Sequence, residues 1–270
     1  MSILTINGAT EASLGLSVLP SGLGDLWSGP ATNRGATSVL GLYGSVPSLV
    51  ATGQEKRIRV GLALDTSSSS RRTNLDAVFR HLDGRLQLEW SDASGLMQWA
   101  RLDVVGARER FAGLSFGATA DWGDVVLELD LILDAPVLFA KNVATLPVSS
   151  TAATIAGLGT LPCAGIFYFS GATTDLTLTY KHGLTRDTIT TLTLDGSTGA
   201  GTVLIINCAR ETLYTWDTTT GALVSVLSLY DTTVSGNAFP IFDQGDGDST
   251  NYPTIESNHT GLVRYRGVYE

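Results

Sequence analysis

Histidine is the usual general base at neutral pH, so the three histidines are the first residues to examine for catalysis. His81, His182 and His259 are scattered along the sequence and have no local metal-ligand spacing. A catalytic triad needs a histidine held between an acid and a nucleophile, and the chain carries no nucleophile-elbow motif. We therefore expect histidines that are solvated or that pack, and we expect no enzyme.

An acidic stretch, DQGDGDST, places Asp243, Asp246 and Asp248 at a spacing that begins like a calcium-binding loop. Counted from Asp246, the sixth position is Asn251 where an EF-hand has glycine, and the twelfth is Ser257 where it has glutamate. The stretch is therefore predicted to be an acidic turn. We expect neither a metal ion nor another cofactor.

Aromatic side chains gather in the second half of the chain. They occupy Phe167, Tyr168 and Phe169 and then Tyr214, Trp216, Tyr230 and Tyr252. A carbohydrate-binding face uses exposed rings of this kind, and the core of a β-sandwich uses buried ones. The core interpretation is favoured, and exposure of the rings would support sugar binding instead.

The two cysteines, Cys163 and Cys208, are too few for a disulfide framework. Each lies beside apolar residues, in LPCAG and LIINCA, and this setting predicts two buried small side chains. A single bridge between them stays open.

The composition is that of an all-β protein with many turns, because charged residues make up only 16% and there are 30 glycines. The net charge of −9 argues against a nucleic-acid-binding surface, which needs clustered Lys and Arg. The charge does not exclude an acidic channel through which DNA slides without specific binding. No apolar run is long enough to span a membrane, and the first residues lack the pattern of a secretory signal.

One helix is predicted in the first half, within TNLDAVFRHLDG. Leu75, Val78, Phe79 and Leu82 recur at i, i+3, i+4 and i+7, which places them in one apolar stripe. Gly84 can supply the left-handed residue that ends a helix. We expect this helix, Phe79 included, to be a core element of its domain.

A β-hairpin is predicted directly after that helix. Residues 85–90 (RLQLEW) alternate between polar and apolar, the turn SDASG follows, and residues 98–105 return as the partner strand. Further strands in the first half are predicted at 3–6, 14–19, 56–64, 113–119 and 125–133. The Gly- and Ser-rich passage 21–48 is predicted to form long loops or a projecting hairpin.

From residue 143 onward charges become rare, and short strands follow one another at the spacing of a β-sandwich. They are predicted at 176–180, 189–194, 202–207, 212–216, 224–229 and 261–270. The predicted class is mainly β with two β-sandwich domains: 1–138, with one α-helix packed on its sheet, and 139–270, galectin-like or jelly-roll-like.

The order of these elements resembles the distal tail proteins of siphophages, the Dit family. In the first half the resemblance rests on TINGATEASLGLSV, KRIRVGLAL, NLDAVFRHLDG and the hairpin LQLEW…QWARLDVV. In the second half it rests on TVLIINCARETLYTW, FPIFDQGDG and VRYRGVYE. The family-like positions of the C-terminal motif are Phe239, Pro240, Gly245, Tyr265 and Tyr269.

The resemblance implies a structural virion protein. Such proteins form a homohexameric ring between the tail tube protein and the tail-tip hub proteins, with DNA passing through the lumen without specific binding. The same role exists in phage-derived gene transfer particles. The implied location is the virion tail tip, after assembly in the host bacterial cytoplasm and without a membrane partner.

The first domain is predicted to form the ring. Within its Gly- and Ser-rich passage, apolar residues stand outside any strong strand pattern, and exposed apolar patches usually mark protein contacts. These candidate interface residues are Leu23, Leu26, Trp27, Leu40, Leu42 and Tyr43.

Two other functions stay open. One is a carbohydrate-binding protein of two β-sandwiches, which exposed aromatic rings would support. The other is a β-rich hydrolase, which would need a convergent acid or nucleophile site that the sequence does not reveal.

Overall fold

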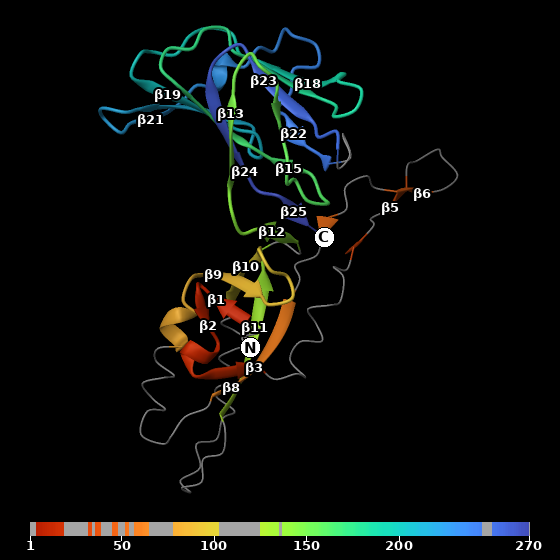
Figure 1. Cartoon of the computed structure of the whole chain (residues 1–270), viewed down its shortest axis with the longest axis vertical. Coiled ribbons are helices and arrows are strands. Elements are labelled where there is room, and N and C mark those ends of the chain that lie inside the picture. The colour runs from red at the N-terminus through yellow and green to blue at the C-terminus, as the bar shows by residue number, and fades with distance from the viewer. Residues whose placement is uncertain are drawn as a thin grey trace, which may run out of the picture. The chain divides into compact units, whose positions relative to one another are not determined.

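The computed structural model describes residues 4–18, 32–33, 36–38, 45–47, 52–53, 57–64, 78–102, 125–134, 137–244 and 250–269. The chain divides into two compact units, Met1–Leu138 (unit 1) and Phe139–Glu270 (unit 2). Both consist mainly of antiparallel strands (Figure 1), and this confirms the predicted mainly β class. Within the described ranges no helix has the length and apolar character needed to cross a membrane.

Unit 1 is organised around one antiparallel sheet with the strand order β2-β1-β9-β10-β11-β8-β3. Its strands are β1 (Leu4–Ile6), β2 (Ala9–Thr10), β3 (Leu16–Val18), β8 (Arg57–Leu64), β9 (Arg85–Trp90), β10 (Leu96–Leu102) and β11 (Val125–Leu133), with a 3-10 turn η1 (Ala12–Leu14) before β3. The predicted strands at 56–64 and 125–133 correspond to β8 and β11. The strand predicted at 113–119 lies outside the described residues.

The predicted hairpin is confirmed. β9 and β10 pair in the register Leu88 opposite Gln98, and the loop between them is 91–95. Leu86, Leu88 and Trp90 are buried, as their alternation predicts. The strand after the turn begins two residues earlier than expected, at Leu96.

The helical residues 78–81 are fixed to the first β-turn by side chains of both segments. Asn7 donates its side-chain amide to the carbonyl of His81 (3.0 Å) and accepts the backbone N–H of Gln87 (2.8 Å). The His81 ring Nε2 lies 2.5 Å from the carbonyl oxygen of Ile6. His81 is therefore a packing histidine, one of the two roles expected. Gly84 follows with φ +78°, the left-handed conformation predicted for it.

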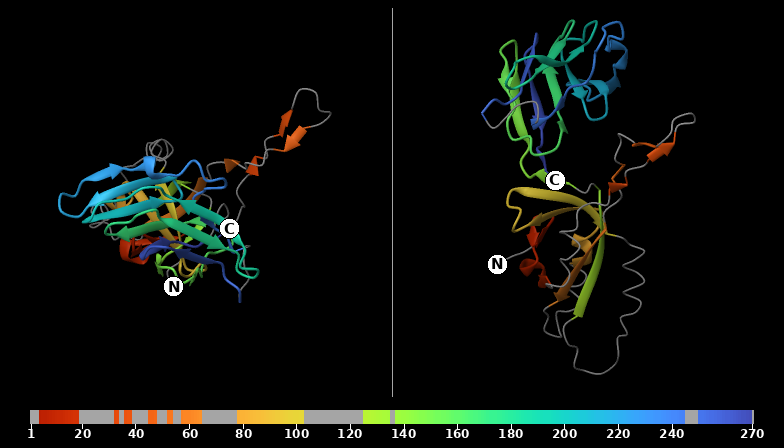
Figure 2. Two further views of the ribbon diagram at one scale, coloured as in Figure 1. Left: turned by 90° about the horizontal axis from the view of Figure 1, so that it is seen from above. Right: turned by 90° about the vertical axis from the view of Figure 1, so that its right-hand side faces the viewer.

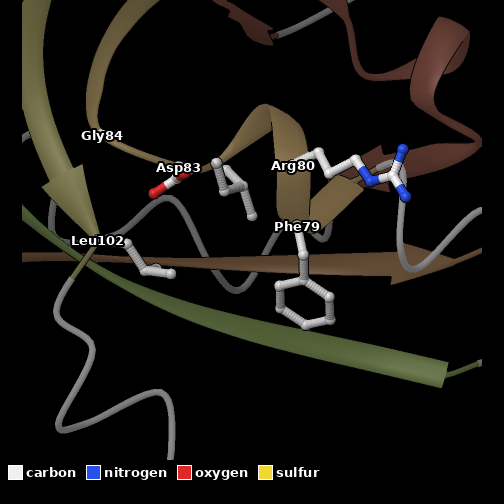
Figure 3. Close-up of a pocket in the computed structure, with 6 residues that line it drawn as sticks. Phe79, Arg80, Asp83, Gly84 and Leu102 are labelled. Atoms are coloured by element: carbon white, nitrogen blue, oxygen red, sulfur yellow. The ribbon is translucent and has the colours of Figure 1, made fainter.

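The predicted apolar stripe is only partly buried. Val78 and Leu82 are fully enclosed in a core with Leu4, Ile6, Leu86, Leu88, Trp90, Ala100, Leu131 and Leu133. Phe79, however, is 37% exposed, so its predicted full burial is wrong. Its ring faces a pocket that Leu102 also lines (Figure 3). Residues 78 and 82 lie one above the other on a helix, whereas residue 79 is turned by about 100° from residue 78. Leu75 lies outside the described residues.

Phe79→Ala is therefore expected to cost about 1–2 kcal/mol of unfolding free energy, since part of the ring is already in water. Leu82→Ala, at 3% exposure, should cost roughly 2–4 kcal/mol through a buried cavity. Denaturation followed by tryptophan fluorescence measures both, because four of the five tryptophans lie in unit 1. A larger loss for Phe79→Ala than for Leu82→Ala would contradict this assignment.

Four short strands of unit 1 fall within and just after the Gly- and Ser-rich passage. β4 (Thr32–Asn33) pairs with β7 (Thr52–Gly53), and β5 (Ala36–Ser38) pairs with β6 (Ser45–Pro47), both antiparallel. Nested antiparallel pairs of this kind are the pattern of a β-hairpin, one of the two structures predicted for this passage.

Unit 2 is a two-layer β-sandwich. One sheet has the order β13-β24-β16-β19-β20-β21, the other has the order β14-β23-β17-β18, and β15 pairs with β22 (Figures 1 and 2). The boundary between the units falls within β12 (Leu138–Ala140). The strands that follow are β13 (Ala144–Val148), β14 (Ala153–Thr154), β15 (Cys163–Ala164), β16 (Ile166–Ser170), β17 (Thr177–Lys181), β18 (Thr188–Thr193), β19 (Thr202–Asn207), β20 (Thr212–Asp217), β21 (Leu223–Ser225), β22 (Ile241–Phe242), β23 (Thr254–Ser257), β24 (Gly261–Tyr265) and β25 (Val268–Tyr269), with a 3-10 turn η3 (Leu227–Leu229).

The core of unit 2 lies between these two sheets. Phe167, Leu204 and Val263 reach it from the first sheet, and Leu178 and Ile255 reach it from the second. All five are fully buried, as the period-two alternation of their strands predicts.

Two predicted strands of unit 2 end early. In place of the strand predicted at 224–229, the structure has β21 followed by the 3-10 turn η3. β21 is the last strand of its sheet, and after it the chain turns so that Leu229 packs on the core. The strand predicted at 261–270 is broken between β24 and β25. At the break, Arg266 donates to the carbonyls of Ala140 (3.0 Å) and Lys141 (2.8 Å).

Candidate interaction surfaces

The residues predicted to form an interface in unit 1 lie outside the described residues. They are Leu23, Leu26, Trp27, Leu40, Leu42 and Tyr43. In sequence, the last three fall between the paired strands β5 and β6. Their role in a contact stays a prediction.

The C-terminal motif has a packing role where it is described. The Tyr265 hydroxyl donates to the carbonyl of Ala156 (2.7 Å) and accepts its N–H (3.2 Å). The Phe239 ring stacks on Tyr230 with 5.5 Å between centroids. Pro240 is buried, Tyr269 belongs to β25, and Gly245 lies outside the described residues. Tyr265, Phe239 and Pro240 therefore help to build the sandwich.

The remaining histidines bind backbone. His182 Nδ1 accepts the N–H groups of Leu184 (3.1 Å) and Thr185 (3.2 Å), and His259 Nε2 lies 2.6 Å from the carbonyl oxygen of Thr174. Neither contact pairs a histidine with an acid and a nucleophile. Each histidine instead fixes a turn.

The two cysteines are free and buried. Burial is the first cause that raises the pKa of the Cys163 thiol, to about 12, and the nearby Asp243 carboxylate raises it further. Burial likewise raises the pKa of Cys208. Since the thiolate is the reactive form, both side chains are inert at neutral pH. The prediction of two small buried side chains is confirmed, and the bridge left open is not formed.

The backbone N–H of Asp243 donates a hydrogen bond to the Tyr180 hydroxyl (2.9 Å). Asp246 and Asp248 lie outside the described residues. Across the described part of the chain, no three His, Cys, Asp or Glu side chains are grouped as metal ligands.

A pocket of about 490 Å³ lies beside the helical residues of unit 1. Phe79, Leu82 and Leu102 give it an apolar wall, and Arg80 and Asp83 carry its charges (Figure 3). Among the described lining residues there is no histidine, cysteine or carboxylate pair. The described lining offers mainly apolar contact area.

The outer face of the six-stranded sheet of unit 2 carries an apolar row. Leu262, Tyr168, Ile205 and Tyr214 stand directly opposite one another on β24, β16, β19 and β20. A second row joins Val203, Trp216 and Leu223. Phe167 and Phe169 point the other way and are fully buried. The aromatic residues thus divide between core and surface, where the core interpretation placed them all inside.

Exposure is greatest at the β20–β21 end of this face. Trp216 is 43% exposed and Leu223 59%. Contiguous exposed apolar groups of this kind usually mark a protein or ligand contact. The sequence contains a sign of this apolar surface, because residues 218–230 include no charged side chain. Only the sheet order shows that β21, within this stretch, is an edge strand.

No protein-family model and no curated protein matches the sequence. Among solved structures, the crystal structure of the Dit protein of phage SPP1 matches with a TM-score of 0.64 and 11% identity, covering 100% of both chains. It is described as a paradigm of the hub adsorption apparatus in phages that infect Gram-positive bacteria. The chain has the Dit fold.

Two structures of the phage p2 baseplate in its activated conformation also match. The one with Sr has a TM-score of 0.49 at 10% identity and 98% coverage of both chains. The one with Ca has a TM-score of 0.47 at 11% identity, covering 94% of this chain and 90% of that chain. The SPP1 match covers both units of the chain, and this agrees with the resemblance drawn from the sequence.

Proposed function

We propose that the protein is the distal tail protein of a siphophage or of a phage-derived gene transfer particle. In this role it is a non-enzymatic hub that joins the tail tube protein to the tail-tip proteins. The observation that carries the proposal is the match to the SPP1 Dit structure over the whole of both chains, because a match confined to one sandwich would fit many functions. The hub lies at the tail tip after assembly in the host cytoplasm.

The working form is a homohexameric ring made by unit 1. A head-to-tail contact repeated about an axis closes a ring when its rotation fits. The apolar residues of the passage 21–48, with Trp27 the largest, supply that contact. The acidic balance of the chain suits a lumen through which DNA passes without binding.

Native mass spectrometry and negative-stain microscopy of the full chain test the ring. Six copies and a central hole are expected, and residues 1–138 should assemble while residues 139–270 form no ring. Trp27→Ser should weaken the ring, whereas Trp216→Ser, in unit 2, should leave it intact. A ring formed by residues 139–270 alone would assign assembly to the wrong unit. A monomeric full chain at high concentration that also fails to assemble on tail tubes would overturn the hub role.

A carbohydrate-binding function is the second candidate, and the outer face of unit 2 favours it. Tyr168 and Tyr214, both half-buried, lie on this face with Ile205 between them, and aromatic rings that reach solvent can stack on sugars. Titration with host cell-wall oligosaccharides tests it. Saturable binding lost in Tyr214→Ala but kept in Tyr230→Phe would support sugar recognition, and no binding to any wall fraction would exclude it.

A further inference from the structure

The open edge of β21 carries unused backbone hydrogen-bonding groups. Asp217 donates to the Ala222 carbonyl (2.9 Å), and Val226 donates to the Leu213 carbonyl (3.0 Å). Because backbone groups alternate in direction along an antiparallel strand, Leu223 and Ser225 direct their N–H and C=O groups away from β20. In the described structure these groups meet no hydrogen-bond partner.

The other edges of the two sheets of unit 2 are blocked or very short, as edge strands usually are. β13 carries Pro147, and proline in a sheet normally directs its missing N–H toward solvent. β18 is covered by Asn237, whose side chain bonds the N–H (2.7 Å) and the carbonyl (2.9 Å) of Thr193. β14 is only two residues long. β21, three residues long, carries neither a proline nor a side chain that covers its edge.

The side chains of this edge are apolar and uncharged. Leu223 and Val224 are more than half exposed on opposite faces of the strand, and Leu227 follows at 50%. Residues 218–230 hold no Asp, Glu, Lys or Arg, although the whole chain has a net charge of −9. Two copies can therefore approach along this edge without the like-charge repulsion that the rest of the surface imposes.

We propose that β21 is a docking edge for β21 of a second copy of this chain. The free groups are arranged symmetrically about Val224, so two copies fit antiparallel across a two-fold axis. Leu223 of each copy then exchanges hydrogen bonds with Ser225 of the other. Val224 faces Val224 of the second copy at a non-hydrogen-bonded position, where Cα atoms lie about 4.5 Å apart.

This contact is separate from the proposed ring. A ring uses a head-to-tail contact, whereas the β21 pair is two-fold and joins unit 2 of one copy to unit 2 of another. In Figures 1 and 2 β21 lies at the outer rim of its own sandwich, where no other strand of unit 2 covers it. The pair is small, so the association is weak for single chains and becomes stronger where several copies are linked.

Disulfide trapping of the full chain tests the register. Val224→Cys brings two thiols to the distance that a disulfide requires, so oxidised glutathione should link the copies rapidly. Leu223→Cys is the matched control, because its partner in the proposed register is Ser225. Cys163 and Cys208 should not react with the oxidant, because both are buried. Linked dimers from Val224→Cys and few from Leu223→Cys are expected; equal yields would overturn the proposal.

A second pair of variants tests the hydrogen bonds themselves. In the Val224→Cys background, Ser225→Pro removes an outward N–H from each copy without removing a β20–β21 bond, whereas Ser225→Ala keeps it. Dimer affinity should fall roughly tenfold or more with Ser225→Pro and stay unchanged with Ser225→Ala. Equal trapping in both variants would show that the edge is not paired.

Discussion

Replacing Phe242 by alanine is expected to lower the unfolding free energy of unit 2 by about 3–5 kcal/mol. Phe242 is fully buried at the centre of an aromatic cluster. Its ring centroid lies 5.5 Å from that of Tyr180, 5.7 Å from that of Tyr265 and 6.1 Å from that of Phe167. The three surrounding rings, on strands of both sheets, cannot collapse into the vacated space without breaking the Tyr265 hydrogen bonds, so most of the cavity would remain.

Thiol labelling across a denaturant series measures this loss in unit 2 alone. Both cysteines of the chain are buried in unit 2, so they react only when that unit opens. Ile241→Ala is the matched control, since the neighbouring side chain is 44% exposed and should cost much less. If Phe242→Ala labelled at the same denaturant concentration as the unsubstituted chain, the ring would not belong to the core.

Replacing Gly159 by alanine is expected to destabilise unit 2 by about 3–5 kcal/mol, because two costs add. Gly159 has φ +89°, a conformation that a residue with a Cβ adopts only under strain. The added Cβ would also lie 2.1 Å from the carbonyl oxygen of Val268, which is backbone and cannot rotate away. β25 would have to leave its position between Leu158 and Leu161, whose backbones bond Val268 on both sides.

Hydrogen exchange at Val268 is the specific measurement, since its N–H donates to Leu158 (2.8 Å) and should be protected. In Gly159→Ala this protection should be lost, and the thiols should label at lower denaturant. Gly157→Ala separates the two costs: its φ is +69° but no atom lies within 4 Å of the new Cβ, so only about 1–2 kcal/mol is expected. Equal effects of the two substitutions would mean that the contact with Val268 is not a constraint.

Local signals in the sequence were sufficient for the individual elements. The five-residue turn before β10, the left-handed Gly84 and the alternation of β9 each depend on residues a few positions apart, so their physical causes can be read directly. The buried faces of β9, β17 and β24 followed from the same alternation. The order of these elements was also enough to indicate the Dit fold.

Tertiary structure decided which surfaces are covered. Phe79 belongs to the helical stripe by its spacing, yet the sheet beneath the helix reaches only Val78 and Leu82, so Phe79 faces the pocket. Tyr168 and Phe167 are neighbours of the same type on one strand, and only the second sheet makes Phe167 core. Residues 224–229 alternate too little and too briefly to reveal that their strand ends at residue 225.

The sequence by itself therefore determined the mainly β class and most strand positions, because period-two alternation and turn residues act over a few positions. It did not determine that β1 lies beside β9, that β21 is an open edge, or that the C-terminal residues 261–270 divide into β24 and β25. Those features depend on which strands pair across many residues of intervening chain. Burial is a property of the assembled layers, so it is settled only when the strands have found their neighbours.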